Sequence, residues 1–223
     1  MTRALVLSGG IFHDFAATSG CLAEMLHRQG LQAEVTEDLE EGLARLPGFD
    51  LLVVNALLWR MAGGDKYVPY RERWAYSPSE AAREAIRDHL LRGRGLLAVH
   101  TAVICFDDWE EWGDLLGASW RWGRSGHPPP GPVRIRVRTG AHRLVEGIGD
   151  FELEDELYGF LDQRPGLDPL MTGEHGGETH PLLWARESLG ARVVVDTLGH
   201  SVESLSVPEH RSILEGALRW VRE

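Results

Sequence analysis

Short runs of consecutive apolar residues alternate with amphipathic stretches over the first half of the chain. Ala4 to Leu7, Asp50 to Asn55 and Gly95 to Val99 each contain four apolar residues in a row. Unbroken apolarity of this length is typical of strands that are buried on both faces of a parallel sheet. Gln32 to Thr36 is a further strand candidate. The pattern predicts an α/β sheet whose strands are joined by helices.

Capping residues and glycines mark the helices expected between these strands. The first helix is expected to be capped by Thr18 or Ser19 and to end at Gly30. The run Ser77-Pro78-Ser79-Glu80 has the pattern of a capping box, with its first serine as the N-cap and the proline at the first helical position. A further helix is expected to end at Gly117. Strand, turn and helix thus repeat in the order of a doubly wound sheet.

The pattern changes after a proline-rich interruption at Pro128 to Gly131. Pro132 to Arg138 alternates apolar residues with arginines, which is the period of a strand with one solvated face. Leu182 to Ala185 and Arg192 to Asp196 are expected to be strands joined by a turn near Gly190, and an amphipathic helix follows from position 208. The C-terminal part is therefore expected to add strands in succession.

Length and charge limit the class of protein. A chain of 223 residues with 43% hydrophobic content is expected to form a single domain. Its net charge of -11 argues against nucleic acid and acidic membranes as partners. The sequence has no apolar stretch of about 20 residues and no signal-like start, so we expect a cytoplasmic protein. Cys21 and Cys105 form no CxxC pair, which leaves a thiolate metal site without support.

Three histidines follow strands that are predicted to end at the same edge of the sheet. His13 comes after the first strand, His100 directly after the central one, and His200 after the strand that includes Arg192 to Asp196. Ligands of open α/β sheets bind outside the carboxyl ends of the strands. Asp155 and Glu156 are adjacent, so an extended backbone points them to opposite faces and at most one readily enters a pocket; Glu156 is the one we expect there. Imidazoles and carboxylates transfer protons near neutral pH and also ligate metals.

Each of these residues also has a purely structural interpretation. The His13-Asp14 pair could cap a helix, His100 could be a hydrogen-bonded core residue, His200 could belong to a plain turn, and Glu156 could be a solvated carboxylate. The segment Glu174 to His180 has the composition of a metal cluster, but its two glycines favour a turn.

Other chemistry-bearing residues have simpler expected roles. We expect His89 to be structural and the thiol of Cys105 to be buried and inert. No nucleotide cofactor is expected, because Ser8-Gly9-Gly10 has neither GxGxxG spacing nor a Walker lysine.

These residues together give the chain a family resemblance. It resembles the ThuA-like family, named for trehalose utilisation, within the class I glutamine amidotransferase-like superfamily. The matching segments are Gly9-Gly10 with His13-Asp14, Gly95 to His100, Asp155 to Tyr158, His180 to Trp184, Gly190 to Val193 and Leu198 to His200. The resemblance implies a single ThuA-like domain over residues 1 to 223. It also implies a flavodoxin-like three-layer sandwich with a mostly parallel sheet and helices on both faces.

The resemblance also implies a site and a link to sugar metabolism. The implied site contains His13, His100, Glu156, Tyr158 and His200. True amidotransferases carry a cysteine in a GxCxG turn, whereas Ala98 to Ala102 has a histidine at its centre and lacks the flanking glycines. We therefore expect no glutamine hydrolysis by that route.

The leading hypothesis is a carbohydrate-metabolism enzyme that hydrolyses or rearranges a sugar derivative by acid/base chemistry. His100 is its expected central proton-transfer group, with His13, His200 and Glu156 assisting. Substrate contacts are expected from Tyr158, Asp14, Trp59 and Trp122. The irregular stretch Trp59 to Tyr76, with Trp120 and Trp122, offers aromatic rings for sugar stacking, although core packing or a dimer contact explains them equally well.

Three alternatives remain open from the sequence. The first is a metal enzyme in which a divalent transition metal is held by His13, His100, His200 and Glu156. The second is a noncatalytic sugar-binding or regulatory protein that uses the same cleft. The third is a structural partner in a homo-oligomer, which predicts that the cleft is occluded.

Overall fold

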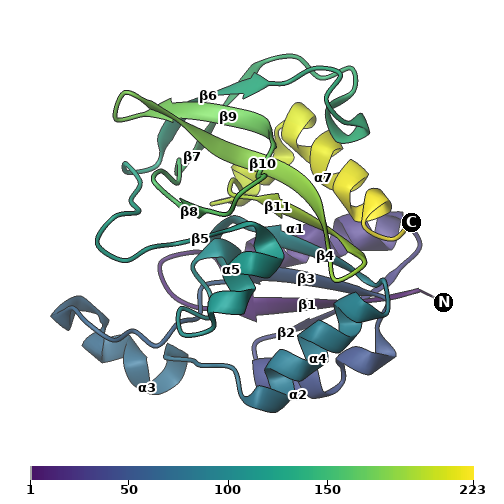
Figure 1. The fold of residues 1–223 in the computed structure, drawn as a ribbon, viewed down its shortest axis with the longest axis vertical. Helices are drawn as coiled ribbons and strands as arrows, with labels where there is room; N and C mark the ends of the chain where they lie inside the picture. The colour runs from purple at the N-terminus through teal and green to yellow at the C-terminus, as the bar shows by residue number, and fades with distance from the viewer. Residues whose placement is uncertain (1) are drawn as a thin grey trace.

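A computed structural model describes residues 2–223 as a nine-stranded sheet covered by helices (Figure 1). Five parallel strands lie side by side in the order β2-β1-β3-β4-β11. They are β1 (Arg3–Gly9), β2 (Gln32–Thr36), β3 (Leu51–Ala56), β4 (Gly95–Val99) and β11 (Ala191–Asp196). This order is the flavodoxin-like 2-1-3-4-5 arrangement, so the expected fold class is confirmed.

Four antiparallel strands extend this sheet beyond β11 in the order β10-β9-β6-β7. They are β6 (Gly131–Val137), β7 (Phe151–Asp155), β9 (Pro169–His175) and β10 (Glu178–Ser188). The strand expected at Leu182 to Ala185 is the centre of the longer β10. A separate two-stranded pair is formed by β5 (Ala118–Ser119) and β8 (Asp162–Gln163). The C-terminal segments thus do add strands in succession, as the sequence predicted.

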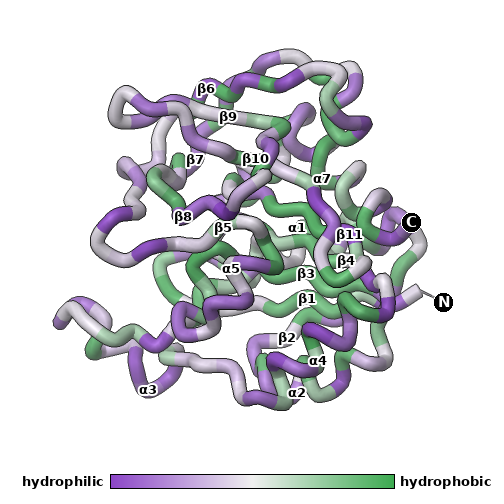
Figure 2. The backbone as a smooth tube through the Cα atoms, in the orientation of Figure 1, coloured by the Kyte–Doolittle hydropathy of each residue, from purple (hydrophilic) through white to green (hydrophobic). Residues whose placement is uncertain are grey.

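Helices cover both faces of the sheet because the central strands are apolar on both sides, as the green strands in Figure 2 show. In β1, Leu5 and Leu7 belong to one core and Ala4 and Val6 to the other. The first core is completed by α2 (Leu39–Ala44), α4 (Glu80–Leu91) and α5 (Glu110–Leu116), and the second by α1 (Phe15–Arg28) and α7 (Pro208–Trp220). Continuous apolar runs therefore predicted a sheet buried on both faces correctly.

The short elements complete the chain. They are α3 (Arg71–Trp74), α6 (Val202–Ser206) and four short 3-10 helices at Leu46–Gly48, Asp65–Tyr70, His100–Val103 and Arg143–Val145. The stretch Trp59 to Tyr76, expected to be irregular, thus contains α3 and a 3-10 helix. None of the helices within residues 2–223 has the length and apolarity needed to cross a bilayer.

Two helix starts differ from the sequence prediction. Helix α1 is capped by Asp14 and begins at Phe15, so neither Thr18 nor Ser19 is the cap. Both hydroxyls lie inside the helix and accept hydrogen bonds of 2.9 Å from the amide of buried Asn55. A serine or threonine hydroxyl can cap a helix or accept from a buried polar group. Here both hydroxyls accept from the buried Asn55 amide and neither caps the helix.

Helix α4 begins two residues later than its capping-box pattern suggested. The N-cap is Ser79, whose hydroxyl accepts from the backbone N–H of Ala82, and the helix starts at Glu80. Ser77, expected as the cap, instead donates its hydroxyl to Asp108. Ser79 is extended, which suits an N-cap, and its backbone N–H and hydroxyl both donate to the carboxylate of Glu40.

Candidate functional site

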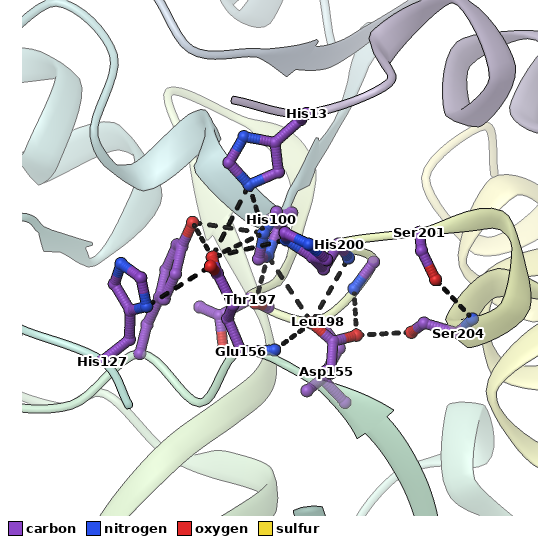
Figure 3. Close-up of polar contacts among 12 residues, drawn as sticks. His13, His100, His127, Asp155, Glu156, Thr197, Leu198, His200, Ser201 and Ser204 are labelled. Atoms are coloured by element: carbon purple, nitrogen blue, oxygen red, sulfur yellow. Dashed lines mark hydrogen bonds and ion pairs between the residues drawn. The ribbon is translucent and has the colours of Figure 1, made fainter. Parts of the chain in front are cut away.

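Four side chains that lie far apart in the sequence converge at the carboxyl edge of the parallel strands (Figure 3). We call them the His–Glu cluster, and they are His13, His100, Glu156 and His200. One nitrogen or carboxylate oxygen from each lies within 4.8 Å of all the others. The histidines follow β1, β4 and β11, and the glutamate follows β7. The structure thus brings together the four residues that the sequence placed at this edge.

Two imidazoles of the cluster meet through nitrogens that carry lone pairs. Nδ1 of His13 lies 3.1 Å from the carbonyl oxygen of Ile11, and Nδ1 of His100 lies 2.9 Å from that of Thr197. A carbonyl only accepts, so both Nδ1 atoms carry the proton. The two Nε2 atoms are nevertheless 3.1 Å apart. Neutral rings would place lone pair against lone pair, so the contact requires a cation, either a proton on one ring or a metal ion shared by both.

The spacing of the cluster suits a divalent metal ion. Oε2 of Glu156 lies 3.6 Å from Nε2 of His13, 3.5 Å from Nε2 of His100 and 3.4 Å from Nδ1 of His200. Ligands at about 2.1 Å from a tetrahedral ion lie about 3.4 Å from one another. The Nδ1 atom of His200 is buried and has no hydrogen-bond partner among the described residues. An unsatisfied buried nitrogen of this kind is expected at an ion site.

The carboxylate of the cluster is held in its charged form. Burial alone would raise the pKa of Glu156, but the imidazoles of His100, His13 and His200 that surround it outweigh burial and hold this pKa far below its usual range. Burial is the main reason that the pKa of His13 is lowered, whereas the neighbouring Glu156 carboxylate raises the pKa of His200. At neutral pH the cluster therefore presents an ionised oxygen beside imidazole nitrogens, which is a ligand set typical of zinc and similar ions.

Asp155 lies on the other side of the backbone from Glu156, where it contacts the backbone that carries Glu156 and His200 (Figure 3). Its side chain is buried and accepts hydrogen bonds from the backbone N–H groups of Glu156 (2.7 Å), Gly199 (2.8 Å) and His200 (3.3 Å), and from the hydroxyl of Ser204. It thus ties the end of β7 to the loop that carries the third histidine. The alternation along an extended backbone, which predicted that only one of the two acids enters the site, agrees with this arrangement.

Tyr158 and His127 complete the surroundings of the cluster. The Tyr158 hydroxyl lies 3.2 Å from Nε2 of His100 and 3.4 Å from Oε2 of Glu156, and burial raises the pKa of this phenol. Nδ1 of His127 lies 3.4 Å from the other oxygen of Glu156. Sequence reasoning missed His127, because it lies in the proline-rich loop before β6 and no strand end marks it.

The backbone at His100 has an uncommon conformation. Its φ angle is +50°, in the left-handed region that non-glycine residues seldom adopt. The loop of Gly199, at φ +115°, packs against it, and a Cβ atom on this glycine would lie 3.0 Å from a methyl group of Val99. Strained turns of this kind occur preferentially at functional sites, where they direct a side chain into the site.

The other predicted substrate residues lie in different surroundings. Asp14 is exposed, and its Oδ1 accepts from the N–H of Ala17, so it serves as the cap of α1. Trp59 is buried and stacks on Trp122, with ring centroids 5.6 Å apart, while Trp122 is 44% exposed.

The residues that were expected to be structural lie outside the His–Glu cluster. His89 is buried and pairs with the carbonyl of Gly95, and burial raises the pKa of the Cys105 thiol to about 12. Glu174 to His180 forms the β9–β10 turn and contributes no member to the His–Glu cluster.

Comparison with known proteins identifies relatives over the whole length of the chain. The family model for ThuA, described as trehalose utilisation, matches residues 3–221. No curated protein matches the chain. A ThuA-like protein from Parabacteroides merdae superposes with a TM-score of 0.77 at 16% identity, over 99% of this chain and 90% of that one.

Two further solved structures share the fold. A cytoplasmic protein from Salmonella typhimurium superposes with a TM-score of 0.65 at 14% identity over 99% of both chains. A β-galactosidase from Rahnella sp. R3 has a TM-score of 0.61 at 12% identity, and the match covers 98% of this chain but 31% of that enzyme. At these identities the likeness establishes the fold alone.

Proposed function

The chain belongs to the ThuA family, described as trehalose utilisation, and from this premise we propose that it is an enzyme of carbohydrate metabolism. It acts on a sugar or modified sugar, by hydrolysis or rearrangement, with a divalent transition metal ion held by the His–Glu cluster. The observation that carries the proposal is the 3.1 Å contact between two Nε2 atoms whose rings both donate through Nδ1. A small uncharged substrate also suits a chain with a net charge of -11.

The contacts behind the ligand atoms support a metal centre. Metal-bound histidines usually donate their second ring nitrogen to a carbonyl or carboxylate, which fixes the ring and its tautomer. His13 and His100 both do so, to Ile11 and Thr197. Asp155 supports the glutamate and the loop of His200 through backbone N–H groups. The ligands are therefore oriented before any ion binds.

A bound divalent ion supplies Lewis acidity toward a carbonyl or hydroxyl oxygen of the sugar. The residues around it supply the other functions. Tyr158, whose raised pKa keeps it protonated, is a hydrogen-bond donor beside the cluster. His127 is the imidazole outside the ligand set, and its partly exposed ring is placed to exchange a proton with solvent. Substrate contact by Trp59 is limited by its burial, whereas Trp122 is accessible.

Glutamine hydrolysis by the amidotransferase route is not part of this proposal. His100 stands where that route requires a cysteine, and its ring faces the cluster. Cys105 lies nearby in the sequence, but its thiol is buried, hydrogen-bonded to Ala56 and held protonated by a pKa of about 12. A thiol in this state is a poor nucleophile.

A second candidate function needs no metal, because a proton also resolves the contact between His13 and His100. An imidazolium on either ring would donate an N–H···N bond across the 3.1 Å separation. His100 would then be the central proton-transfer group, assisted by His13, His200 and Glu156. The two functions exclude each other, because a nitrogen that ligates a metal ion has no lone pair left for a proton.

Elemental analysis of protein purified without a histidine tag distinguishes the two. The metal function predicts about one equivalent of a transition metal per chain, and His200→Ala is expected to lower it below about a tenth of an equivalent. His175→Ala is the matched control, because this histidine lies in β9 outside the cluster and its loss should leave the metal content unchanged.

Turnover then separates the remaining outcomes. Full turnover of a sugar by protein that holds less than about a tenth of an equivalent would overturn the metal function and leave acid/base catalysis. A binding or regulatory protein would be indicated if the wild type turned over no sugar but bound one, and if His200→Ala weakened that binding.

A further inference from the structure

A cavity of about 280 Å³ lies where helix α5 approaches the strand pair β5–β8 (Figure 1). It is lined by residues 103–110, by Trp112 and Gly113 of α5, and by residues 119–121 with Arg164. None of the four residues of the His–Glu cluster lines it. The cavity is therefore distinct from the site described above.

Two buried polar atoms of the residues around this cavity lack hydrogen-bond partners. Among residues 2–223, four buried side-chain polar atoms have none. One is Nδ1 of His200 in the cluster, and another is Nδ1 of His89 in the core. The other two are Oδ1 of Asp108 and Nε1 of Trp120, and both residues line the cavity. A carboxylate oxygen accepts and an indole N–H donates, so these two atoms suit an occupant that offers one donor and one acceptor.

Other groups of the same two residues are already engaged. Oδ2 of Asp108 accepts from the Ser77 hydroxyl and lies 3.4 Å from Nη2 of Arg83. The backbone N–H of Trp120 donates to the carbonyl of Val103 at 2.8 Å. The carboxylate and the indole are thus positioned by contacts that leave Oδ1 and Nε1 unused.

The one charged lining residue without an ion-pair partner is an acid. The other four form ion pairs: Asp107 with Arg60 (3.2 Å), Asp108 with Arg83 (3.4 Å), Arg121 with Asp162 (2.6 Å) and Arg164 with Asp114 (2.6 Å). Glu110 is exposed and forms no ion pair within residues 2–223. The charge that remains available to an occupant is therefore negative, and it favours a cation.

We propose that this cavity is a second ligand site, which binds a small organic ammonium that also carries a hydroxyl or carbonyl oxygen, as an amino alcohol does. The ammonium donates to Oδ1 of Asp108, and the oxygen accepts from Nε1 of Trp120. Glu110 adds a second negative charge for the ammonium. The occupant also contacts the ring that packs edge-on against Tyr158, with centroids 5.3 Å apart, beside the His–Glu cluster.

The test compares three probes with nearly the same skeleton. They are serinol (2-amino-1,3-propanediol), glycerol, in which a hydroxyl replaces the ammonium, and the anion glycerate. The eight tryptophans give eight indole N–H signals in a ¹⁵N NMR spectrum, and Trp120→Phe identifies the signal of Trp120 by its loss. We expect serinol to shift this signal in a saturable way with a Kd of about 1 mM, and glycerol and glycerate to bind at least about tenfold more weakly.

Matched variants test the two contacts. Trp120→Phe keeps a ring but removes the donor, and it should weaken serinol binding about tenfold, as followed on the backbone N–H signals that serinol moves. Trp220→Phe, at the end of α7, is its control. Glu110→Gln should weaken binding about threefold. Glu209→Gln is the control for this change, because Glu209 lies in the first turn of α7 as Glu110 lies in the first turn of α5.

Asp108→Asn should weaken serinol binding about tenfold as well. If the loss of its contacts with Ser77 and Arg83 prevents folding, Trp120→Phe and Glu110→Gln decide the question without it.

Three results would overturn the second site. The first is that serinol binds no more tightly than glycerol or glycerate, or that no probe binds up to about 100 mM. The second is a serinol titration that leaves the indole signal of Trp120 in place, and the third is an affinity that Trp120→Phe and Glu110→Gln both leave unchanged. Protein treated with chelator should bind serinol as untreated protein does, so the result does not depend on a metal ion in the His–Glu cluster.

Discussion

Two buried groups of histidines and carboxylates lie at the same end of the sheet and differ in how their polar atoms are satisfied. In the first, the His–Glu cluster, two Nε2 atoms face each other and one Nδ1 has no hydrogen-bond partner among the described residues. In the second, which we call the buried network, Nε2 of His210 lies 2.9 Å from Asp196 and its Nδ1 lies 2.9 Å from the carbonyl of Ser204. The same residue types thus form a site in one place and a structural contact in the other.

The charges of the two groups differ as well. Burial alone would lower the pKa of His210, but Asp196 outweighs burial and raises it. A buried ion pair whose hydrogen bonds are complete needs no further ligand. The cluster concentrates imidazole nitrogens around one carboxylate, and its ring contact is incomplete without a cation. Unsatisfied atoms that gather around one carboxylate therefore distinguish the cluster from the buried network. A single unsatisfied atom does not mark a site, because Nδ1 of buried His89 also has no partner among the described residues.

The largest expected effect comes from a matched pair of leucine substitutions. His210→Leu leaves Asp196 buried without its partner and should lower the free energy of unfolding by about 3–5 kcal/mol. His13→Leu removes the contact between two lone pairs together with the hydrogen bond from Nδ1 of His13 to the Ile11 carbonyl. It should change the free energy of unfolding by less than about 1 kcal/mol in chelator, because these two effects oppose each other. Urea unfolding at pH 7 measures both. Equal losses would mean that the cluster is as structural as the network.

The pH dependence of stability tests a third kind of buried histidine. His89 has no carboxylate partner, and burial lowers its pKa from 6.5 to about 4. Below pH 6.5 His89 binds a proton in the unfolded chain but not in the folded chain. The free energy of unfolding therefore falls as the pH drops towards 4.

The expected loss between pH 7 and pH 5 is about 2 kcal/mol from this residue. His89→Gln, which keeps a donor for Gly95, should remove that part of the slope, as urea unfolding at both pH values would reveal. His210 contributes in the opposite direction, because its raised pKa gives stability that is present at low pH and is lost as the pH rises through the folded value. An unchanged slope in the glutamine variant would contradict the assignment to His89.

The smallest expected effect comes from Asp155, which joins the two groups. It accepts from the backbone of His200 on one side and from the Ser204 hydroxyl on the other. Asp155→Asn keeps the shape but weakens these contacts, and it should lower metal affinity about tenfold by freeing the His200 loop. Asp168→Asn, at an exposed ion pair with Arg138, is the control for metal titration. An unchanged metal affinity would limit Asp155 to a purely structural role.

The parallel half of the molecule was predictable because its signals are local. Apolar runs mark β1, β3 and β4, and the rule that ligands bind at the carboxyl ends of parallel strands places three histidines at one edge from the sequence alone. The exact helix starts were less predictable. The hydroxyls of Thr18 and Ser19 pair with Asn55, which lies more than 30 residues away, and no local pattern contains that partner.

The contribution of the antiparallel half was harder to predict. Strand β7 is at the far edge of the sheet order, yet its last residue, Asp155, accepts from Gly199 just beyond β11. Glu156 therefore reaches the cluster because the extended sheet curls back, and curling depends on long-range packing. For this reason the sequence pattern alone left Glu156 open as a site residue or a solvated carboxylate until the family resemblance favoured the site, and it gave no sign of His127.

The position of Glu156 couples ligand binding to the cohesion of the whole sheet. Three members of the cluster are anchored in the parallel strands, and the fourth arrives from the edge of the antiparallel extension. Any ion that all four hold must bind more weakly once the two parts separate, so by thermodynamic linkage it opposes their separation. Ion binding at the His–Glu cluster therefore also stabilises the contact between the parallel and the antiparallel half of the sheet.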